Sequence, residues 1–405
     1  MGIKTIVLIT TGQPSVNPRI VKEADALQAT GYKVIVLYCF WIQWAMGADA
    51  ELLKNVKWDH QLIGGSPSFN KWQYIFTKSR WKSNRFLNKI FGNKWLFAER
   101  TQARCYDELL KAAKSIQADW YIGHNLGALP IVVEAAKYNS AKSGFDFEDY
   151  HREEVAGLPL NDLNRIIYIE KKYVPQLQYI STASTLITEK ITQNFPLHSN
   201  EVLTIFNCFP LSQQQAFRDK SAGDNTLQLF WFSQTIGKNR GLEVLFTVLE
   251  ELNDQSIHLT LAGRCNKDLE MYIEEHAASI KNNIHFAGII QPGKLPSFAA
   301  TFDVGLAIEL AEPNNRNICL TNKIFTYLLA GNAVILSRTT MQEAFNEQYQ
   351  IGQSFNVNNA SQLKAKIIYY KKTTQLELQR KHNYELAKHT LNWETESKKL
   401  LSVID

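Results

Sequence analysis

Positively charged side chains stand at the starts of three predicted helices, where the helix dipole disfavours a cation by about 0.3 to 1 kcal/mol. They are Arg19, Arg240 and Lys323. Each follows a predicted strand and a loop, so the backbone N–H groups, the dipole and the side chain would point at one place. A bound anion there would turn the penalty into attraction. The pattern predicts phosphate binding, most naturally of a nucleotide diphosphate, although any one cation alone is open to being incidental.

Neighbouring residues add polar groups, but the common phosphate motifs are absent. Lys238 precedes Arg240 by two residues, and Thr321 is suited to cap the helix that Asn322 begins. No GxGxxG motif is present, which disfavours a dinucleotide-dependent dehydrogenase. The segment GIIQPGKL, residues 288–295, lacks the hydroxyl that a P-loop requires after its lysine, and we interpret it as a chance match.

Acidic residues gather in DFEDYHREE, residues 146–154. Asp146-x-Glu148 is one candidate for a metal-binding acidic pair, and a solvated or acceptor-facing loop is the other. Because the cluster lies within a β/α series, we favour the loop, with Asp149 and His151 on the acceptor side. We expect no metal site and no cofactor.

The charge of the chain is uneven. Its formal net charge is +5, but residues 67–104 carry nine basic residues against one acid, Glu99. Trp and Phe residues are interleaved with these cations, a mixture that suits an anionic membrane interface. Stacking on single-stranded nucleic acid uses the same ingredients. The third alternative is a helical hairpin whose aromatic residues form a core and whose cations are only solvated.

Composition places the chain among ordinary globular proteins. It has 405 residues, of which 45% are hydrophobic and 20% charged, and this excludes the disordered and collagenous classes. No apolar run reaches the roughly 18 residues of a membrane-crossing helix, and the N-terminus shows no secretory signal. Five scattered cysteines without a CxxC pair indicate reduced thiols. We therefore expect a cytoplasmic protein, with peripheral membrane contact through residues 67–104.

Two successive series of strands and helices can be read along the chain. Residues 5–10 and 33–39 are apolar strands that flank a helix at residues 18–30, which begins with Pro and ends before Gly. Polar residues 210–225 are the best linker candidate. The pattern predicts an α/β protein with two doubly wound domains and a ligand cleft at the carboxyl ends of their strands.

Five motifs occur in the order and spacing of GT-B-fold glycosyltransferases. They are GQPSVNPRIVKEADAL (12–27), YIGHNLGALP (121–130), LTLAGR (259–264), HFAGII (285–290) and LTNKIFTYLLAGNAVI (320–335). The chain most resembles the retaining group-1, or family 4, enzymes. The resemblance implies GT-B architecture, with two Rossmann-like domains facing across a cleft. An acceptor domain would span residues 1–209 with the basic aromatic insertion 67–104, a donor domain 226–373, and helices 374–405 would return to the first domain.

The resemblance also implies site residues, position by position. His124 matches the histidine that lies beside the sugar in some members, and we assign it the catalytic role. The donor side would take Gly12, Lys238, Arg240, Gly263, Arg264, Thr321, Asn322 and Lys323. The acceptor side would take Asn17, Arg19, Asn125, Asp149 and His151.

Two departures from the family pattern concern the donor. The Glu that bonds the ribose hydroxyls would fall at Thr326, and its companion Glu at Ile318. The first basic residue of the pyrophosphate clamp would fall near Thr235. Glu309 and Glu312 are nearby candidates to replace the missing acids.

These observations predict sugar transfer from a nucleotide-diphosphate donor to a glycan or lipid-linked acceptor of a bacterial surface polysaccharide. In a retaining enzyme the leaving phosphate takes the acceptor proton, so no dedicated base is required. Two alternatives stay open at this point. One is a GT-B scaffold that has lost donor binding, and the other is a nucleic-acid-binding protein that acts through residues 67–104, which we do not expect.

Overall fold

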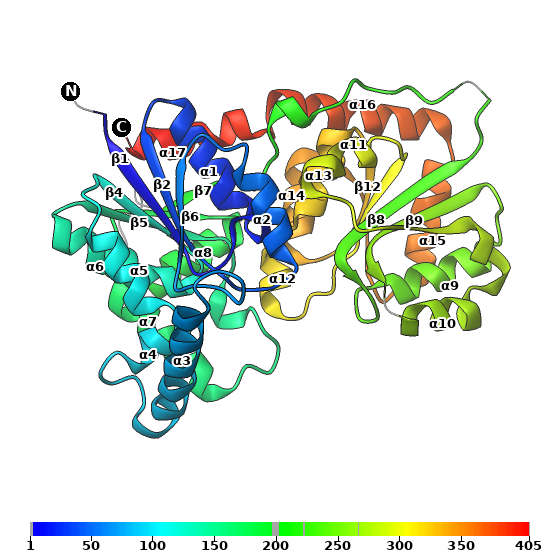
Figure 1. Ribbon diagram of the computed structural model, residues 1–405. Helices are drawn as coiled ribbons and strands as arrows, with labels where there is room; N and C mark the ends of the chain where they lie inside the picture. The colour runs from blue at the N-terminus through cyan, green and yellow to red at the C-terminus, as the bar shows by residue number, and fades with distance from the viewer. Residues whose placement is uncertain (1–2, 197–201, 222, 266, 405) are drawn as a thin grey trace. The chain divides into compact units, whose positions relative to one another are not determined.

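The computed structural model describes residues 3–196, 202–221, 223–265 and 267–404. The chain divides into two compact units (Figure 1). The first unit comprises Met1–Ile205 with Ser397–Asp405, and the second comprises Phe206–Glu396. The chain therefore returns to the first unit only in its last residues.

The first unit is built on a seven-stranded parallel sheet with the order β3-β2-β1-β4-β5-β6-β7. Its strands are β1 (Thr5–Thr10), β2 (Lys33–Cys39), β3 (Asp59–Ile63), β4 (Trp120–His124), β5 (Lys142–Phe147), β6 (Tyr179–Thr182) and β7 (Val202–Thr204). Its helices are α1 (Pro18–Ala29), α2 (Ala45–Leu53), α3 (Lys71–Phe91), α4 (Phe97–Gln102), α5 (Tyr106–Lys114), α6 (Leu129–Asn139), α7 (Leu160–Tyr173) and α8 (Thr185–Asn194). The central strands β1 and β4 are mostly apolar, and all of their residues except Thr5 are buried, as expected where helices cover both faces.

The second unit has a six-stranded parallel sheet with the order β10-β9-β8-β11-β12-β13. Its strands are β8 (Leu227–Ile236), β9 (Ile257–Cys265), β10 (Ile284–Gly288), β11 (Val304–Ala307), β12 (Ala333–Ser337) and β13 (Gly352–Phe355). The helices are α9 (Leu242–Leu252), α10 (Lys267–His276), α11 (Leu295–Ala299), α12 (Asn314–Ile318), α13 (Asn322–Ala330), α14 (Thr340–Tyr349), α15 (Ala360–Tyr370), α16 (Thr373–His389) and α17 (Trp393–Ile404), the last of which runs into the first unit. Both sheets confirm the predicted α/β class.

Each sheet contains one point at which the strand order reverses. In the first unit β1 pairs with both β2 and β4, and in the second unit β8 pairs with both β9 and β11. Ligands of open α/β sheets bind outside the carboxyl ends of the strands at such a point. The loops after β1, β4, β8 and β11 are therefore the places to look for a site.

Some expected elements differ from those observed. Residues 210–225, proposed as a linker, belong to the second unit, and described residues among them pack against α16. Phe217 lies 5.3 Å from the ring of Tyr384, and Arg380 Nη2 donates to the carbonyl of Arg218 at 2.8 Å. The sequence pattern also missed β3, β5, β6 and β13, all of which contain polar residues. None of the described helices has both the length and the apolar composition that crossing a bilayer would require.

Gly263 has a structural reason to be glycine. The register between β8 and β9 shifts between Phe232 and Thr235, and Gly263 adopts φ +141° opposite this irregularity. A Cβ on Gly263 would lie only 2.1 Å from the carbonyl oxygen of Ser233. The close approach of two backbones thus accounts for this glycine without a donor, although we had assigned it to the donor side.

We expect Gly263→Ala to destabilise the protein by about 1–3 kcal/mol, because it combines an unfavourable φ with a backbone clash. Gly293→Ala is the matched control, since a Cβ there would meet nothing within 4 Å. Chemical denaturation of both variants measures the difference. Equal stability of the two would contradict the bulge explanation.

Candidate functional site

Arg19 and Asp146 form a buried ion pair at the carboxyl end of the first sheet. Arg19 Nε lies 2.6 Å from Asp146 Oδ2, and Nη2 lies 2.7 Å from Oδ1, with side chains only 2% and 1% exposed. Arg19 Nη1 donates to the carbonyl of Ile205 at 2.6 Å. Burial opposes the charged carboxylate, yet Arg19 and His124 together hold the pKa of Asp146 below its usual value.

This pair corrects two expectations. Arg19 is not a free cation that could bind an anionic ligand at the start of α1, because Asp146 already neutralises its charge. The helix start is instead capped by Asn17, whose Oδ1 accepts from the amide of Ile20 at 3.3 Å. Asp146 is not in a solvated loop either, since it lies within the buried strand β5. Arg19 therefore has a structural role in this geometry. The cap uses only Oδ1 of Asn17, whose buried Nδ2 has no hydrogen-bond partner among the described residues, so the acceptor-side role of Asn17 stays a prediction.

His124 ends β4 and adjoins the same cluster. Its ring is 1% exposed, with Nε2 2.8 Å from Glu23 Oε2 and Nδ1 3.7 Å from Asp146 Oδ2. Burial disfavours a charged ring, but Glu23 and Asp146 outweigh it and raise the pKa of His124. The predicted catalytic contact with a sugar does not match this geometry, because the ring is enclosed and faces a carboxylate. The arrangement instead suits a residue that positions the end of β4.

Glu23 was missed by the sequence analysis, although a signal was present. Arg19 and Glu23 are four residues apart in a helix, so they share a face. That face also carries Ile20, Ala24 and Leu27, all of which are buried. Opposite charges on an apolar helix face indicate a buried polar cluster. Ser181 of β6, which donates to Asp146 Oδ1 at 2.5 Å, gave no such signal.

Gly12 and Asn125 do lie together at the switch point of the first sheet. Thr10 ends β1, and its Oγ1 donates to Asn125 Oδ1 at 2.5 Å and accepts from the Gly12 amide at 3.2 Å. Asn125 is exposed and has φ 68°, an uncommon conformation outside glycine. The hydroxyl of Thr10 thus joins two predicted residues from different motifs.

The other predicted acceptor residues follow β5. His151 is 8% exposed, and its Nδ1 lies 3.0 Å from Glu154 Oε2. Burial works against protonation of His151, but Glu154 outweighs it and raises the pKa of the ring. Asp149 is partly exposed. Glu148, which the sequence offered as one member of a candidate metal-binding pair, directly follows β5. Desolvation, Asp149 and Asp146 raise its pKa from 4.5 to about 7.

In the second unit, Lys238 and Arg240 lie in the loop after β8, at the switch point. Arg240 is partly buried and forms no ion pair with another described residue. Lys238 is exposed, with Nζ 5.3 Å from the ring centroid of Tyr272. Gly241, with φ 75°, is the residue that caps α9. Arg240 therefore precedes the helix, which corrects the expectation that it opens the first turn.

Glu243 supplies the acid that the first turn of α9 favours. One of its carboxylate oxygens accepts from the amide of Asn239 at 2.6 Å. Arg240 therefore lacks an acidic partner among the described residues, in a loop where Glu243 accepts from the amide of Asn239. This is the arrangement that an anionic ligand would complete.

Lys323 opens α13 and is paired within the unit. Its Nζ lies 2.5 Å from Glu309 Oε1 and 5.3 Å from the ring centroid of Trp231. Glu309 follows β11, and its amide donates to the hydroxyl of Ser337 at 2.9 Å. The position of Glu309, which the sequence left open, is therefore at the switch point, next to the predicted cation.

The start of α13 has one hydroxyl without a partner. Thr321 occupies the predicted capping position, but its Oγ1 is buried and makes no hydrogen bond to the described residues. Asn322 Oδ1 accepts from Asn207 Nδ2 at 2.7 Å. Arg264, at the end of β9, is exposed and makes no ion pair within the described ranges. Arg240, Lys323 and Arg264 thus follow or adjoin neighbouring strands of one sheet.

Thr326 is buried, and its hydroxyl is hydrogen-bonded within its own helix. It is 0% exposed, and its Oγ1 donates to the carbonyl of Asn322 at 2.9 Å. The hydroxyl therefore cannot replace a carboxylate that reaches a ligand. Within residues 3–404, apart from the undescribed gaps, no group of three metal-binding side chains occurs.

The fold and these loops can be compared with known proteins. No protein-family model matches the chain, and no curated protein matches its sequence. Solved structures do match over nearly the whole chain. HepE of Anabaena, solved with UDP and glucose, is 13% identical, with 99% of each chain covered and a TM-score of 0.69.

Two other matches agree. Sucrose-phosphate synthase of Thermosynechococcus elongatus is 12% identical, covering 99% of this chain and 98% of its own, with a TM-score of 0.71. TarM of S. aureus is 10% identical over 100% of both chains, with a TM-score of 0.68. The structural neighbours are GT-B glycosyltransferases, and the chain has the GT-B fold with two Rossmann-like domains. This confirms the fold that the sequence motifs implied.

We expect Asp146→Asn to destabilise the protein by about 3–5 kcal/mol, because the variant leaves the buried Arg19 without its counter-charge. The same exchange at Asp219, whose exposed pair with Lys381 spans 3.1 Å, should cost less than about 1 kcal/mol. Denaturant titration measures both. A small effect at Asp146 would show that the pair is not the buried constraint described.

Glu148→Gln should change how stability depends on pH. The folded protein retains a proton on Glu148 that the unfolded chain releases above pH 4.5, so wild-type stability falls as pH rises towards about 7. The free energy of unfolding of the variant should not show this decrease. Between pH 4.5 and about 7 the variant should therefore become more stable relative to the wild type, by up to about 3 kcal/mol. Unfolding measured from pH 4 to 8 tests this, and parallel curves would refute the raised pKa.

Proposed function

We propose that the chain is a nucleotide-sugar-dependent glycosyltransferase of the retaining, family 4-like type. The observation that carries this proposal is the carboxyl end of the second sheet. There an unpaired Arg240, a paired Lys323 and the unpartnered hydroxyl of Thr321 surround the switch point. A diphosphate would supply acceptor oxygens to Arg240 and to the hydroxyl of Thr321, and the GT-B neighbour HepE was solved with UDP-glucose.

The proposed chemistry needs positive charge near the phosphates. Transfer breaks the bond between the anomeric carbon and the diphosphate oxygen, and joins that carbon to an acceptor hydroxyl. Negative charge develops on the departing diphosphate, where Arg240, Lys238 and Lys323 would stabilise it. The leaving phosphate oxygen takes the proton of the acceptor hydroxyl, so the reaction proceeds without a separate carboxylate base. No metal is required in this scheme.

The carboxylate of Glu309 would compete with a donor diphosphate for Lys323. In the absence of a donor it neutralises Lys323, and a bound diphosphate would compete for the same ammonium group. Released from Lys323, the carboxylate of Glu309 would be available to accept hydrogen bonds from ribose hydroxyls. This would supply the function that Thr326, buried and bonded to Asn322, does not perform.

For the substrates we propose a hexose-type sugar and a glycan or lipid-linked acceptor of a bacterial surface polysaccharide. Support for the acceptor comes from the first unit, whose Asn125, Asp149 and Glu148 follow β4 and β5 at the carboxyl edge of the sheet. His124 would act through its contact with Glu23 as a positioning residue.

Thr326 favours one alternative function. Its side chain is enclosed and cannot bind a ribose, so a GT-B scaffold that has lost its donor and acts as the partner of an active transferase is the second candidate. Calorimetry with UDP and GDP separates the two proposals, since a scaffold should not bind either nucleotide.

We expect Arg240→Ala to weaken UDP or GDP binding by at least about tenfold, because a charge-assisted bond to phosphate is worth about 1.5–3 kcal/mol. Lys388→Ala, an exposed cation on α16, is the control and should bind as the wild type does. Titration calorimetry provides the affinities, and a panel of nucleotide sugars tests for release of UDP or GDP. Absence of binding and of turnover with every donor would reject the transferase.

A further inference from the structure

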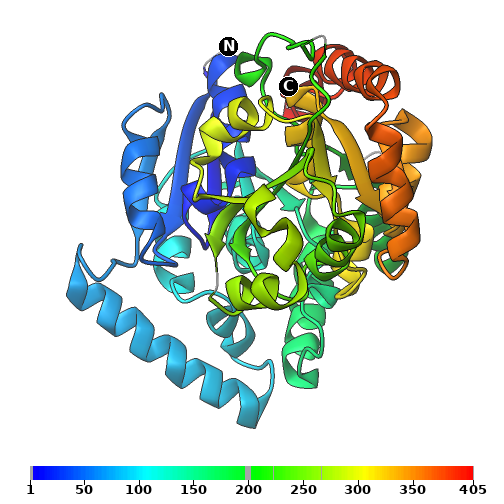
Figure 2. The ribbon, with the colours of Figure 1, turned by 90° about the vertical axis from the view of Figure 1, so that its right-hand side faces the viewer.

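Helix α3 directs a polar face to the protein and an apolar face to the outside, the reverse of a typical surface helix of a globular protein. Its inward face is polar: Thr77, Asn84 and Asn88 are the buried residues of the helix. Its outward face carries large apolar side chains. A surface helix normally directs its apolar stripe to the core, so α3 indicates a second apolar environment on its outer side. In Figure 2 this long helix runs along the margin of the first unit.

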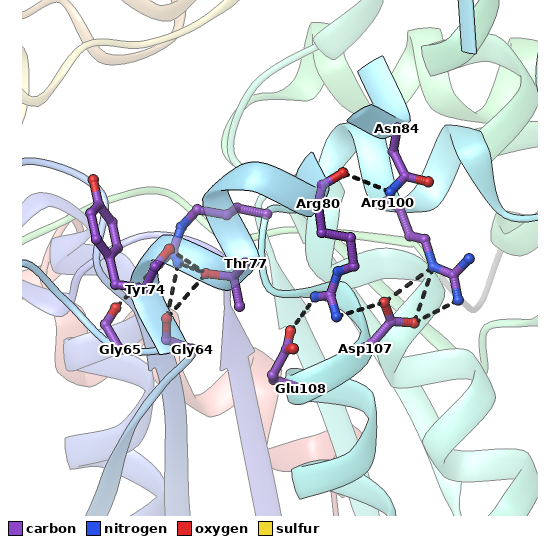
Figure 3. Close-up of polar contacts among 10 residues, drawn as sticks. Gly64, Gly65, Tyr74, Thr77, Arg80, Asn84, Arg100, Asp107 and Glu108 are labelled. Atoms are coloured by element: carbon purple, nitrogen blue, oxygen red, sulfur yellow. Dashed lines mark hydrogen bonds and ion pairs between the residues drawn. The ribbon is translucent and has the colours of Figure 1, made fainter. Parts of the chain in front are cut away.

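Polar contacts on the inward face hold α3 in place (Figure 3). Arg80 Nη2 lies 2.5 Å from Glu108 Oε2, and Nη1 lies 3.3 Å from Asp107 Oδ2. Thr77 Oγ1 donates to the carbonyl of Gly64 at 3.3 Å. The indole of Trp81 donates to the carbonyl of Thr101 at 2.8 Å. These contacts fix the orientation of the helix, so that its opposite face is exposed.

The outer face is strongly apolar. Trp72 is 83% exposed, Phe76 62%, Phe86 64% and Ile90 56%. Their positions, at i, i+4, i+14 and i+18, lie on one side of a helix. The exposure excludes the reading in which the aromatic residues of this segment form a core. An apolar patch of this kind on a soluble surface marks a contact with another apolar medium.

Cations border this apolar face. Lys71, Lys78, Lys82, Arg85 and Lys89 are all exposed, and α3 contains no acidic residue. Within the described residues none of the five forms an ion pair. They lie towards one side of the apolar stripe, at spacings of three, four and seven residues. Uncompensated cations beside an apolar stripe are complementary to a layer with anionic headgroups above hydrocarbon.

Nucleic acid fits this surface less well. Stacking on bases requires aromatic faces presented outward between cations. Here two of the rings among the cations are occupied within the protein, since Arg85 covers Trp81 at 4.7 Å and Arg104 covers Tyr74 at 5.0 Å. The outward stripe also includes Ile90, which has no ring to stack.

We propose that the outer face of α3 binds the surface of an anionic phospholipid bilayer, with the helix lying parallel to it. The apolar side chains enter the boundary between headgroups and acyl chains, and the lysines contact anionic headgroups. This inference is independent of the proposed transfer activity, because binding to lipid can be measured without a sugar donor.

The test is flotation of the full-length protein with vesicles of phosphatidylcholine alone or with one third phosphatidylglycerol. We expect binding to the anionic vesicles that weakens with salt. Lys78→Glu, Lys82→Glu and Lys89→Glu combined should reduce partitioning by at least about tenfold. Lys388→Glu with Lys398→Glu, which reverses exposed charges on other helices, should not.

A second triple variant separates the apolar contribution from charge. Trp72→Ser, Phe76→Ser and Phe86→Ser combined should also abolish flotation, because the side chains removed are the ones that enter the bilayer. The matched control removes Met271, Ile289 and Leu378, three exposed apolar residues of the second unit, in the same way. Circular dichroism and thermal unfolding confirm that each variant is folded.

Three results would overturn the proposal. They are no flotation of the wild type, equal flotation of the α3 variants and their controls, or tighter binding of the same face to a single-stranded oligonucleotide than to anionic vesicles. Loss of flotation by the two α3 variants, with retention by both controls, supports it. Because UDP binding is measured separately, failure here leaves the transferase proposal standing, and the reverse is also true.

Discussion

The structure depends on how charges buried at the carboxyl ends of the two sheets are neutralised. In the first unit, Arg19 and Asp146 form a bidentate pair in which both side chains are almost completely buried. Removing either charge would leave the other buried without its counter-charge, which costs far more than a surface pair contributes. Because α1, β4, β5 and β6 all supply members of this cluster, the pair and its neighbours join those four elements at the carboxyl end of the sheet.

In the second unit, the charges at the carboxyl end of the sheet are only partly neutralised by the protein. Lys323 is neutralised by Glu309, while Arg240 has no acidic partner among the described residues. A cation in a loop at the switch point is stable only because water or a ligand can reach it. This contrast is the reason we propose an anionic substrate at the second sheet, whereas the corresponding cation of the first sheet, Arg19, is neutralised by Asp146.

Much of the fold was readable from the sequence, and less of the site. Apolar runs at residues 5–10 and 33–39 coincide with β1 and β2, and the helix at residues 322–330 coincides with α13. Short polar strands such as β3 carry too weak a pattern to be recognised. The role of His124 could not be predicted, because Glu23 and Asp146 approach its ring from two other elements.

By itself, the sequence determined that the chain forms two parallel β/α series and that residues 67–104 concentrate positive charge among aromatic residues. Periodicity and composition are local properties, so they need no knowledge of neighbours. Tertiary structure alone decided which cations remain unpaired and which side of α3 is turned outward. Ion pairs such as Arg19 with Asp146 join residues 127 positions apart, and no local pattern specifies which partner a buried charge will meet.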